Sequence, residues 1–146
     1  MLVSHPYKLA VIEDDPMQIA YLKKLLSKHS EDFVVYDFSS PLEALEAIKK
    51  ESIRIIITDI NMPDMYGDDL LREVMSLKIG ASVYILTGAE SLMLANRCLE
   101  NGARSILRKP ITREKLDHIL SDAKTHFDDW NIILRELIAS KNKDKG

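Results

Sequence analysis

The chain has 146 residues, a length that matches one ordinary domain and leaves no room for a separate cofactor module. Hydrophobic residues make up 46% and charged residues 29%, so a core can form and the charge excess is too small for a disordered tail. The formal net charge of −3 predicts no direct binding of nucleic acid or of an anionic membrane. With a single cysteine, Cys98, and no apolar run near the ~18 residues of a membrane helix, we expect a cytoplasmic protein.

In the first half of the chain, short apolar runs typical of strands alternate with segments whose apolar residues have helical spacing. Residues 8–12 form a short apolar run followed by three acids, and residues 17–30 carry leucines at helical spacing, which predicts a strand and then a helix. Residues 33–38 are rich in aromatic and β-branched side chains and predict a second strand. A second helix is expected to begin at Pro41, because Ser40 is a typical N-cap and proline fits the first helical position.

The second half repeats the alternation. The elements expected there are strands at 53–58, 83–86 and 105–107 and helices at 70–77, at 92–99 and from about Thr112. Five strands alternating with helices predict an α/β fold, a doubly wound parallel sheet covered on both faces. In such sheets ligands bind beyond the carboxyl ends of the strands, so the residues at those ends are the candidates for function.

Polar side chains follow four of the predicted strands. Glu13 and Asp14 end the first strand, and Asp59 ends the third. Carboxylates that meet at one edge repel each other unless a cation neutralises them, and oxygen ligands favour Mg²⁺, with Mn²⁺ as a substitute. With Thr87 and Lys109 at the ends of the fourth and fifth strands, the edge contains a nucleophile, a hydroxyl and an ammonium, the parts that phosphoryl transfer needs.

Four motifs occur at these strand ends. They are Val11-Ile12-Glu13-Asp14-Asp15-Pro16, Asp59-Ile60-Asn61-Met62-Pro63 with Gly67 downstream, Leu86-Thr87-Gly88, and Lys109-Pro110. Each is weak alone, but together and in this order they are specific, and over residues 8–125 the chain resembles the receiver domain of response regulators, the phosphoacceptor module of two-component signalling. The resemblance implies a flavodoxin-like sheet of order 2-1-3-4-5 with five helices, here with an extended C-terminal helix.

The resemblance also implies roles for individual residues. Asp59 corresponds to the phosphoacceptor, which takes a phosphoryl group from a histidine kinase or a histidine phosphotransfer protein in a Mg²⁺-dependent reaction. Thr87 would bond the phosphoryl group, Lys109 would pair with it, and the peptide bond before Pro110 would be cis. The residues implied to hold the metal are Asp14 and Asp59 directly, Glu13 through water and Asn61 through its backbone carbonyl. Such a chain is a signalling module and not an ordinary enzyme, although it catalyses its own phosphorylation and dephosphorylation.

One position departs from the family's pattern. Members usually carry Tyr or Phe three residues before the lysine, and that ring moves inward as the threonine is drawn to the phosphoryl group. Here the position is Ile106, which can repack but has a smaller swing and no hydroxyl. Thr87 and Ile106 are therefore the expected switch residues, while the usual readout by the fourth helix and fifth strand is in question.

Three other functions fit these residues less well. A haloacid-dehalogenase-like phosphatase also uses an aspartate nucleophile, Mg²⁺ and lysine, but its nucleophile follows the first strand, whereas Asp59 follows the third. A flavin carrier of the same topology needs a hydroxyl-rich phosphate loop after the first strand, where Glu13 and Asp14 would repel the phosphate. A degenerate receiver that only binds partners would not need the complete set of acids, threonine and lysine.

The first helix is the expected docking surface for the phosphodonor. It begins beside the strand ends, so a phosphohistidine that approaches Asp59 passes over it. The candidate contacts are Met17, Gln18 and Tyr21.

The chain continues beyond the expected receiver domain, residues 1–127, into an extension over 128–146. Apolar residues continue through it at alternating spacings of three and four, including Trp130, Leu134 and Leu137, a heptad pattern without Gly or Pro. This segment either docks back on the body after a break at Asp128-Asp129 or pairs with a second copy, and we favour a homodimer, because the exposed stripe is unfavourable in water. The lysine-rich end after Ser140 is expected to be a frayed terminus or a linker to an output domain, so the chain either acts through protein contacts alone or is a fragment.

Overall fold

The structure is a computed structural model that describes residues 2–62, 65–88 and 92–145, so Pro63 of the second motif lies outside the described residues. The strands are β1 (Tyr7–Ile12), β2 (Phe33–Phe38), β3 (Ile55–Asp59), β4 (Ser82–Thr87) and β5 (Ser105–Arg108). The helices are α1 (Pro16–Leu26), the short 3₁₀ helix η1 (Ser27–His29), α2 (Pro41–Glu51), α3 (Gly67–Ser76), α4 (Leu92–Glu100) and α5 (Arg113–Lys145).

The five strands form one parallel sheet in the order β2-β1-β3-β4-β5. The central strand β3 is buried along its whole length, and its isoleucines pair with β1 on one side and β4 on the other. This is the doubly wound sheet of order 2-1-3-4-5 that the sequence predicts, and the prediction of the fold class is confirmed.

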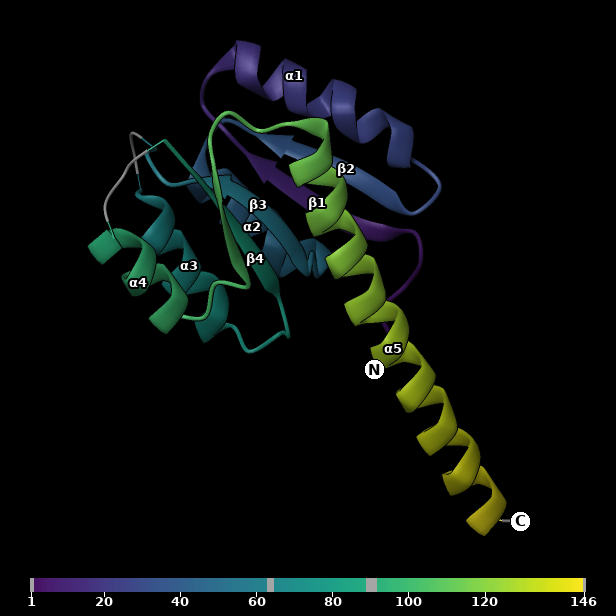
Figure 1. Ribbon diagram of the computed structural model, residues 1–146. Coiled ribbons are helices and arrows are strands. Elements are labelled where there is room, and N and C mark those ends of the chain that lie inside the picture. Colours follow the sequence, from purple (N-terminus) through teal and green to yellow (C-terminus); the bar gives the residue numbers. More distant parts are fainter. Residues whose placement is uncertain (1, 63–64, 89–91, 146) are drawn as a thin grey trace.

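Helices cover both faces of the sheet and enclose two hydrophobic clusters (Figure 1). Leucines of α1 and the first half of α5 pack on one face with Leu9, Ile55 and Ile57. Side chains of α2, α3 and α4 pack on the other face with Ile56, and Cys98 of α4 is fully buried there, as expected for a free cysteine. Because successive side chains of a strand point to opposite faces, neighbouring isoleucines of β3 serve the two clusters alternately.

Side chains cap the first two helices. The Oγ atom of Ser40 accepts a hydrogen bond from the backbone N–H of Glu43 at 3.4 Å, and Pro41 is the first residue of α2, which confirms the predicted start. At α1 the cap is Asp15, whose carboxylate accepts a hydrogen bond from the Met17 N–H at 2.9 Å. One of the three acids after β1 therefore caps a helix.

Two element boundaries differ from the prediction for local reasons. Residue 53 was expected to begin the third strand, but it takes part in the C-terminal cap of α2. Ser52 adopts a left-handed conformation (φ 53°) and caps that helix, and the next N–H, of Ile53, donates to the Ile48 carbonyl. The helix expected at 70–77 begins three residues earlier, because Gly67 is the first residue of α3. Both differences shift the ends of elements and leave the topology unchanged.

The last helix is continuous from Arg113 to Lys145 and extends beyond the body of the molecule (Figure 1). This continuity contradicts the alternative of a break at Asp128-Asp129, and the segment after Ser140 is helical through Lys145 instead of frayed. Body contacts also continue past Phe127. The buried amide of Asn131 accepts from the N–H of Val3 and donates to its carbonyl, both at 2.8 Å, and the Tyr7 hydroxyl donates to Asp128.

Within the described part of the chain, every helix is too short or too polar to cross a lipid bilayer.

Candidate functional site

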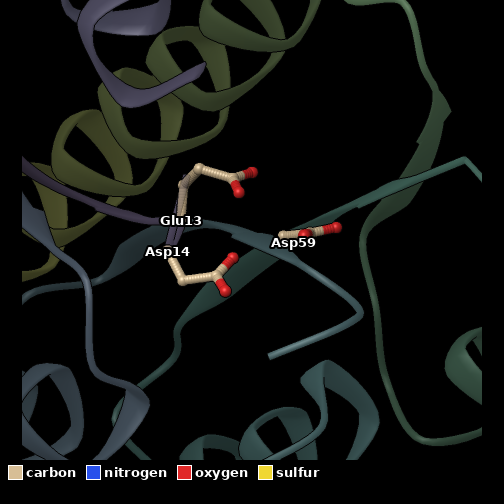
Figure 2. Close-up of side chains that lie close together, drawn as sticks. All are labelled: Glu13, Asp14 and Asp59. Atoms are coloured by element: carbon tan, nitrogen blue, oxygen red, sulfur yellow. The ribbon is translucent and has the colours of Figure 1, made fainter. Parts of the chain in front are cut away.

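The acidic residues predicted from the strand ends lie together at the carboxyl edge of the sheet (Figure 2). Ile12 of β1 pairs with Thr58 of β3, so the residues that follow, Glu13 and Asp59, come side by side. Asp14 joins them from the loop after β1. Each of these three residues offers a carboxylate oxygen, and the three oxygens lie within 4.8 Å of one another. Glu13 and Asp59 are buried, whereas Asp14 is exposed, so the cluster is accessible from one side.

The ammonium group of Lys109 lies against this cluster. Its Nζ atom is 3.3 Å from Oδ1 of Asp59 and 3.4 Å from Oε2 of Glu13. The backbone fixes this position, because the Lys109 N–H donates to the Thr87 carbonyl at 2.7 Å and continues the β4·β5 pairing beyond Arg108. The bond between Lys109 and Pro110 is cis, as the resemblance implies.

Burial changes the acidity of Glu13. The carboxyl group is removed from water and lies beside the Asp59 carboxylate, and both effects raise the pKa of Glu13. The N–H of Asp15 and the ammonium of Lys109 act in the opposite direction, but the pKa remains above its usual value. The edge therefore carries more negative charge than one lysine balances, and a further cation would be stabilised there.

The loop after β3 is held close to Asp59 by Gly67. Its N–H donates to the Ile60 carbonyl at 2.7 Å, and a Cβ atom at this position would lie 2.7 Å from both the Asp59 carbonyl oxygen and the Ile60 Cα. Only glycine permits this approach without moving the backbone. Asn61 lies in the same loop, two residues after Asp59, with its side chain exposed.

The predicted switch residues lie on neighbouring strands beside α4. Thr87 is the last residue of β4 and is 9% exposed, while Ile106 is a partly buried residue of β5. Both line a groove of about 730 Å³ that also involves Leu94 and Cys98 of α4. The groove gives the side chain of Ile106 space to repack.

The three docking candidates of α1 differ in their contacts. Met17 is 82% exposed. Gln18 instead accepts a hydrogen bond from Lys109 Nζ at 2.8 Å, and the Tyr21 hydroxyl donates to the Ile111 carbonyl at 2.9 Å. Sequence reasoning missed both bonds, because their partners lie 91 and 90 residues away and no pattern in the chain indicates them.

A second polar network was also missed. Asp122 of α5 is bonded by both Nε and Nη2 of Arg104, at 2.7 and 3.1 Å, and by the buried Tyr84 hydroxyl at 2.8 Å. Burial and the neighbouring carboxylate raise the pKa of Tyr84, while Arg104 holds the pKa of Asp122 below its usual value. Asp122 therefore joins α5 to β4 and to the residue before β5.

The donor set at the acidic edge fits a small divalent cation. The three carboxylates offer hard oxygen ligands, which Mg²⁺ and Mn²⁺ prefer and softer metals do not. The same edge holds a nearly buried carboxylate, an ammonium group and a hydroxyl at the next strand end. Together these groups can accept a phosphoryl group and stabilise the charge on its oxygens.

Comparison with known proteins gives one family. A family model for the response regulator receiver domain matches residues 9–121. The transcriptional regulatory protein GlrR of Escherichia coli (strain K12) is 31% identical over 122 residues, which is 83% of this chain and 27% of that protein. This chain spans only part of the length of the curated relatives it matches, 27% of GlrR, 55% of a putative transcriptional regulator of Pseudomonas aeruginosa and 12% of the sensor histidine kinase RcsC of Salmonella typhi.

Solved structures agree with this result. The crystal structure of a response regulator receiver domain protein from Clostridium thermocellum is 32% identical, with a TM-score of 0.73, and the match covers 88% of this chain and 98% of that one. A chain in the crystal structure of the CheX-CheY-BeF3-Mg²⁺ complex from Borrelia burgdorferi is 25% identical, with a TM-score of 0.72 over 80% of this chain and 88% of that one. The sheet order, the acidic edge and these matches together show that the chain belongs to the response regulator receiver domain family of two-component signalling.

Proposed function

We propose that the chain is a phosphoacceptor that takes a phosphoryl group on Asp59 from a histidine kinase or a histidine phosphotransfer protein. The observation that carries the proposal is the position of Asp59 between two further carboxylates and the ammonium of Lys109, 3.3 Å from its Oδ1. A carboxylate in this setting is a nucleophile with a cation already beside it, which phosphoryl transfer requires.

The proposed transfer is a displacement at phosphorus. An Oδ atom of Asp59 forms a bond to phosphorus while the phosphorus–nitrogen bond of the donor's phosphohistidine breaks, and the imidazole nitrogen keeps the electron pair and takes a proton. Lys109 moves from the free carboxylate to an oxygen of the phosphoryl group, and the Thr87 hydroxyl donates to another. In dephosphorylation, water attacks the phosphorus, releases inorganic phosphate and restores the Asp59 carboxylate. The chain thus catalyses its own phosphorylation and dephosphorylation.

The reaction is proposed to need Mg²⁺. Asp14 and Asp59 would hold the ion directly, Glu13 through water and Asn61 through its backbone carbonyl, with Mn²⁺ as a substitute. The carboxylate cluster supports this assignment, since three carboxylates beside the single ammonium of Lys109 leave negative charge for a cation to balance. When bound, the ion would neutralise charge that develops on the phosphoryl oxygens.

Phosphorylation is proposed to change the surface beside α4. As Thr87 turns towards the phosphoryl group, Ile106 is free to repack in the groove that both residues line. The change would reach α4 through Leu94 and Cys98, and downstream proteins would recognise the altered surface.

The donor is proposed to dock on α1, with Met17, Gln18 and Tyr21 at the contact. Met17 gives the cleanest test, because it is 82% exposed and the other two side chains hold parts of the β5–α5 connection. Met17→Ala should slow transfer from a phosphotransfer protein several-fold. If transfer from that protein keeps its rate, α1 is not the docking surface.

The experiment that tests the function is intact-mass measurement after incubation with acetyl phosphate. We expect one added phosphoryl group in the presence of Mg²⁺, no addition after chelation, and no addition in Asp59→Asn. Asp14→Ala should fold and lose both labelling and Mg²⁺ binding, because the substitution relieves repulsion between carboxylates while it removes a ligand. Labelling that persists in Asp59→Asn would refute the assignment of the phosphoacceptor.

The extension over 128–146 is proposed to form a homodimer contact through Trp130, Leu134 and Leu137. Trp130 and Leu137 are 48% and 61% exposed on a helix that continues past the body.

The chain is also proposed to be located in the cytoplasm, which imaging of a fluorescent fusion in cells would test.

A further inference from the structure

The side-chain amide of Gln18 bridges the start of α1 and the lysine of the site. Its Oε1 atom accepts a hydrogen bond from Lys109 Nζ at 2.8 Å, and its Nε2 group donates to Oδ2 of Asp15 at 3.4 Å. The two contacts fix the orientation of the amide, since the oxygen must face the ammonium and the nitrogen must face the carboxylate. Asp15 is itself fixed as the N-cap of α1 through the Met17 N–H.

Gln18 is the nearest of three described acceptors around the ammonium. Asp59 and Glu13 lie farther from Lys109 Nζ, at 3.3 and 3.4 Å. An ammonium group has three donors, and a neutral amide oxygen occupies one of them without cancelling the positive charge. Gln18 thus holds the ammonium beside the carboxylates and leaves its charge available to the group that reacts there.

A second bond ties α1 to the same connection. The Tyr21 hydroxyl, about one turn along α1, donates to the carbonyl of Ile111, two residues after the lysine. The side chain of Lys109 and the backbone that follows it are therefore both attached to one face of α1. A displacement of that face displaces the lysine.

We propose that Gln18 is a positioning residue for Lys109, and that through it a partner docked on α1 acts on the chemistry at Asp59. The proposal rests on the proposed phosphoacceptor function and adds a route by which the donor's docking surface is coupled to the site. Among the described contacts, the side chain of Gln18 bonds to Lys109 and Asp15 and to neither Asp14 nor Asp59, so its effect passes through the position of the lysine.

Gln18→Met tests this, because it keeps the length of the side chain and removes the acceptor. We expect labelling by acetyl phosphate under saturating Mg²⁺ to slow about 3- to 10-fold, the range for losing one partly solvated hydrogen bond to a charged group. The half-saturating concentrations of acetyl phosphate and Mg²⁺ should stay unchanged, since neither ligand contacts Gln18. Gln18→Ala, which removes the same acceptor with a smaller side chain, should slow labelling to a similar extent.

The control is Lys24→Met, an exposed position in the last turn of α1 that should label at the wild-type rate. The structural readout is the NMR signal of the Lys109 ε-methylene group, assigned by its loss in Lys109→Arg. It should shift in both Gln18 variants and not in the control, with thermal midpoints unchanged.

Two results would overturn the proposal. One is wild-type labelling in Gln18→Met, and the other is slow labelling with an unmoved Lys109 signal. If the wild-type chain itself is not labelled, that result refutes the phosphoacceptor function. It differs from the two results above, in which the wild-type chain is labelled and only the role of Gln18 is refuted.

Discussion

At the scale of single residues, the contacts of the acidic edge converge on Lys109. Three side chains that are far apart in the chain, Glu13, Gln18 and Asp59, contact its ammonium. The acids could be predicted from the sequence because each directly follows a recognisable strand. Gln18 could not, because a polar residue in the first turns of a helix is ordinary and only the folded chain brings it to the lysine.

The raised pKa of Glu13 makes a prediction for stability. Between pH 4.5, the unfolded value, and the higher folded pKa, the folded chain binds more protons than the unfolded chain, so stability falls as pH rises through this window. At pH values above the folded pKa, Glu13 is ionised in the folded chain, and the full cost of burying this charge is subtracted from the free energy of unfolding. Glu13→Gln should therefore have a larger free energy of unfolding than the wild type at about pH 7 without metal, and the difference should vanish below pH 4.5.

Urea denaturation at the two pH values measures this difference. The matched control is Glu136→Gln on the exposed surface of α5, which should change stability little at either pH. A Glu13→Gln chain that is less stable than the wild type at neutral pH would mean that contacts of the carboxylate outweigh its burial.

Gly67 gives a second prediction at this scale. In Gly67→Ala the new Cβ atom would lie 2.7 Å from backbone atoms of residues 59 and 60, which must move. We expect a loss of about 1–3 kcal/mol in the free energy of unfolding, the usual range for forced backbone shifts. Gly88→Ala is the control, because no heavy atom lies within 4 Å of its Cβ position, and its effect should stay within about 0.5 kcal/mol. Equal losses in both variants would show that the loop at Gly67 adjusts freely.

At the scale of elements, periodicity and caps predicted the helices and strands well, and the missed features come from tertiary contacts. Pro41 and Ser40 fixed the start of α2, since their effects are local. The sequence leaves the continuity of α5 through residue 128 open, because Asp128-Asp129 is compatible with a break; in the structure Asp128 accepts hydrogen bonds from Tyr7 and from Lys124 one turn earlier. The bond from Tyr7 spans 121 residues, and a partner at that distance leaves no periodic signal in the sequence.

Asn131 provides the prediction for α5. It is 3% exposed, and its amide bonds both the N–H and the carbonyl of Val3, which attaches the N-terminal segment to the helix beyond the predicted domain boundary. Asn131→Leu should lower the free energy of unfolding by about 1–2 kcal/mol, because two backbone groups lose their partners. Ile132→Ala, at an exposed neighbouring position, should change it far less, as urea denaturation will show. Equal effects would assign the loss of stability to the helix itself and not to the hydrogen bonds between Asn131 and Val3.

At the scale of the whole molecule, α5 is both part of the core and an unpartnered projection. Its first half packs on the sheet through Leu116, Leu120 and Phe127, while its last turns extend past the body (Figure 1). Because Asn131 belongs to the body, cutting the chain after Phe127 would remove a structural contact as well as the exposed stripe. Substitutions in the stripe therefore test self-association better than truncation does.

Pairing through the stripe should be modest in strength, because only a few turns of helix are available. Light scattering of the wild-type chain should show a mass that rises towards the dimer with concentration, more steeply with beryllofluoride bound. Leu137→Lys should remain monomeric, since it places a charge in the stripe, whereas Glu136→Lys places the same charge one residue away and should still pair. A wild-type chain that stays monomeric in both states would exclude the homodimer.

The most direct test of the central claim is chemical identification of the residue that carries the phosphoryl group. Borohydride reduces an aspartyl phosphate to the alcohol and releases inorganic phosphate, so the modified position becomes homoserine and can be found by peptide mass spectrometry. After incubation with acetyl phosphate and Mg²⁺, we predict homoserine at position 59 and its absence when the metal is chelated. Homoserine at position 14, or no homoserine at position 59 in a chain whose mass shows the added phosphoryl group, would contradict the assignment.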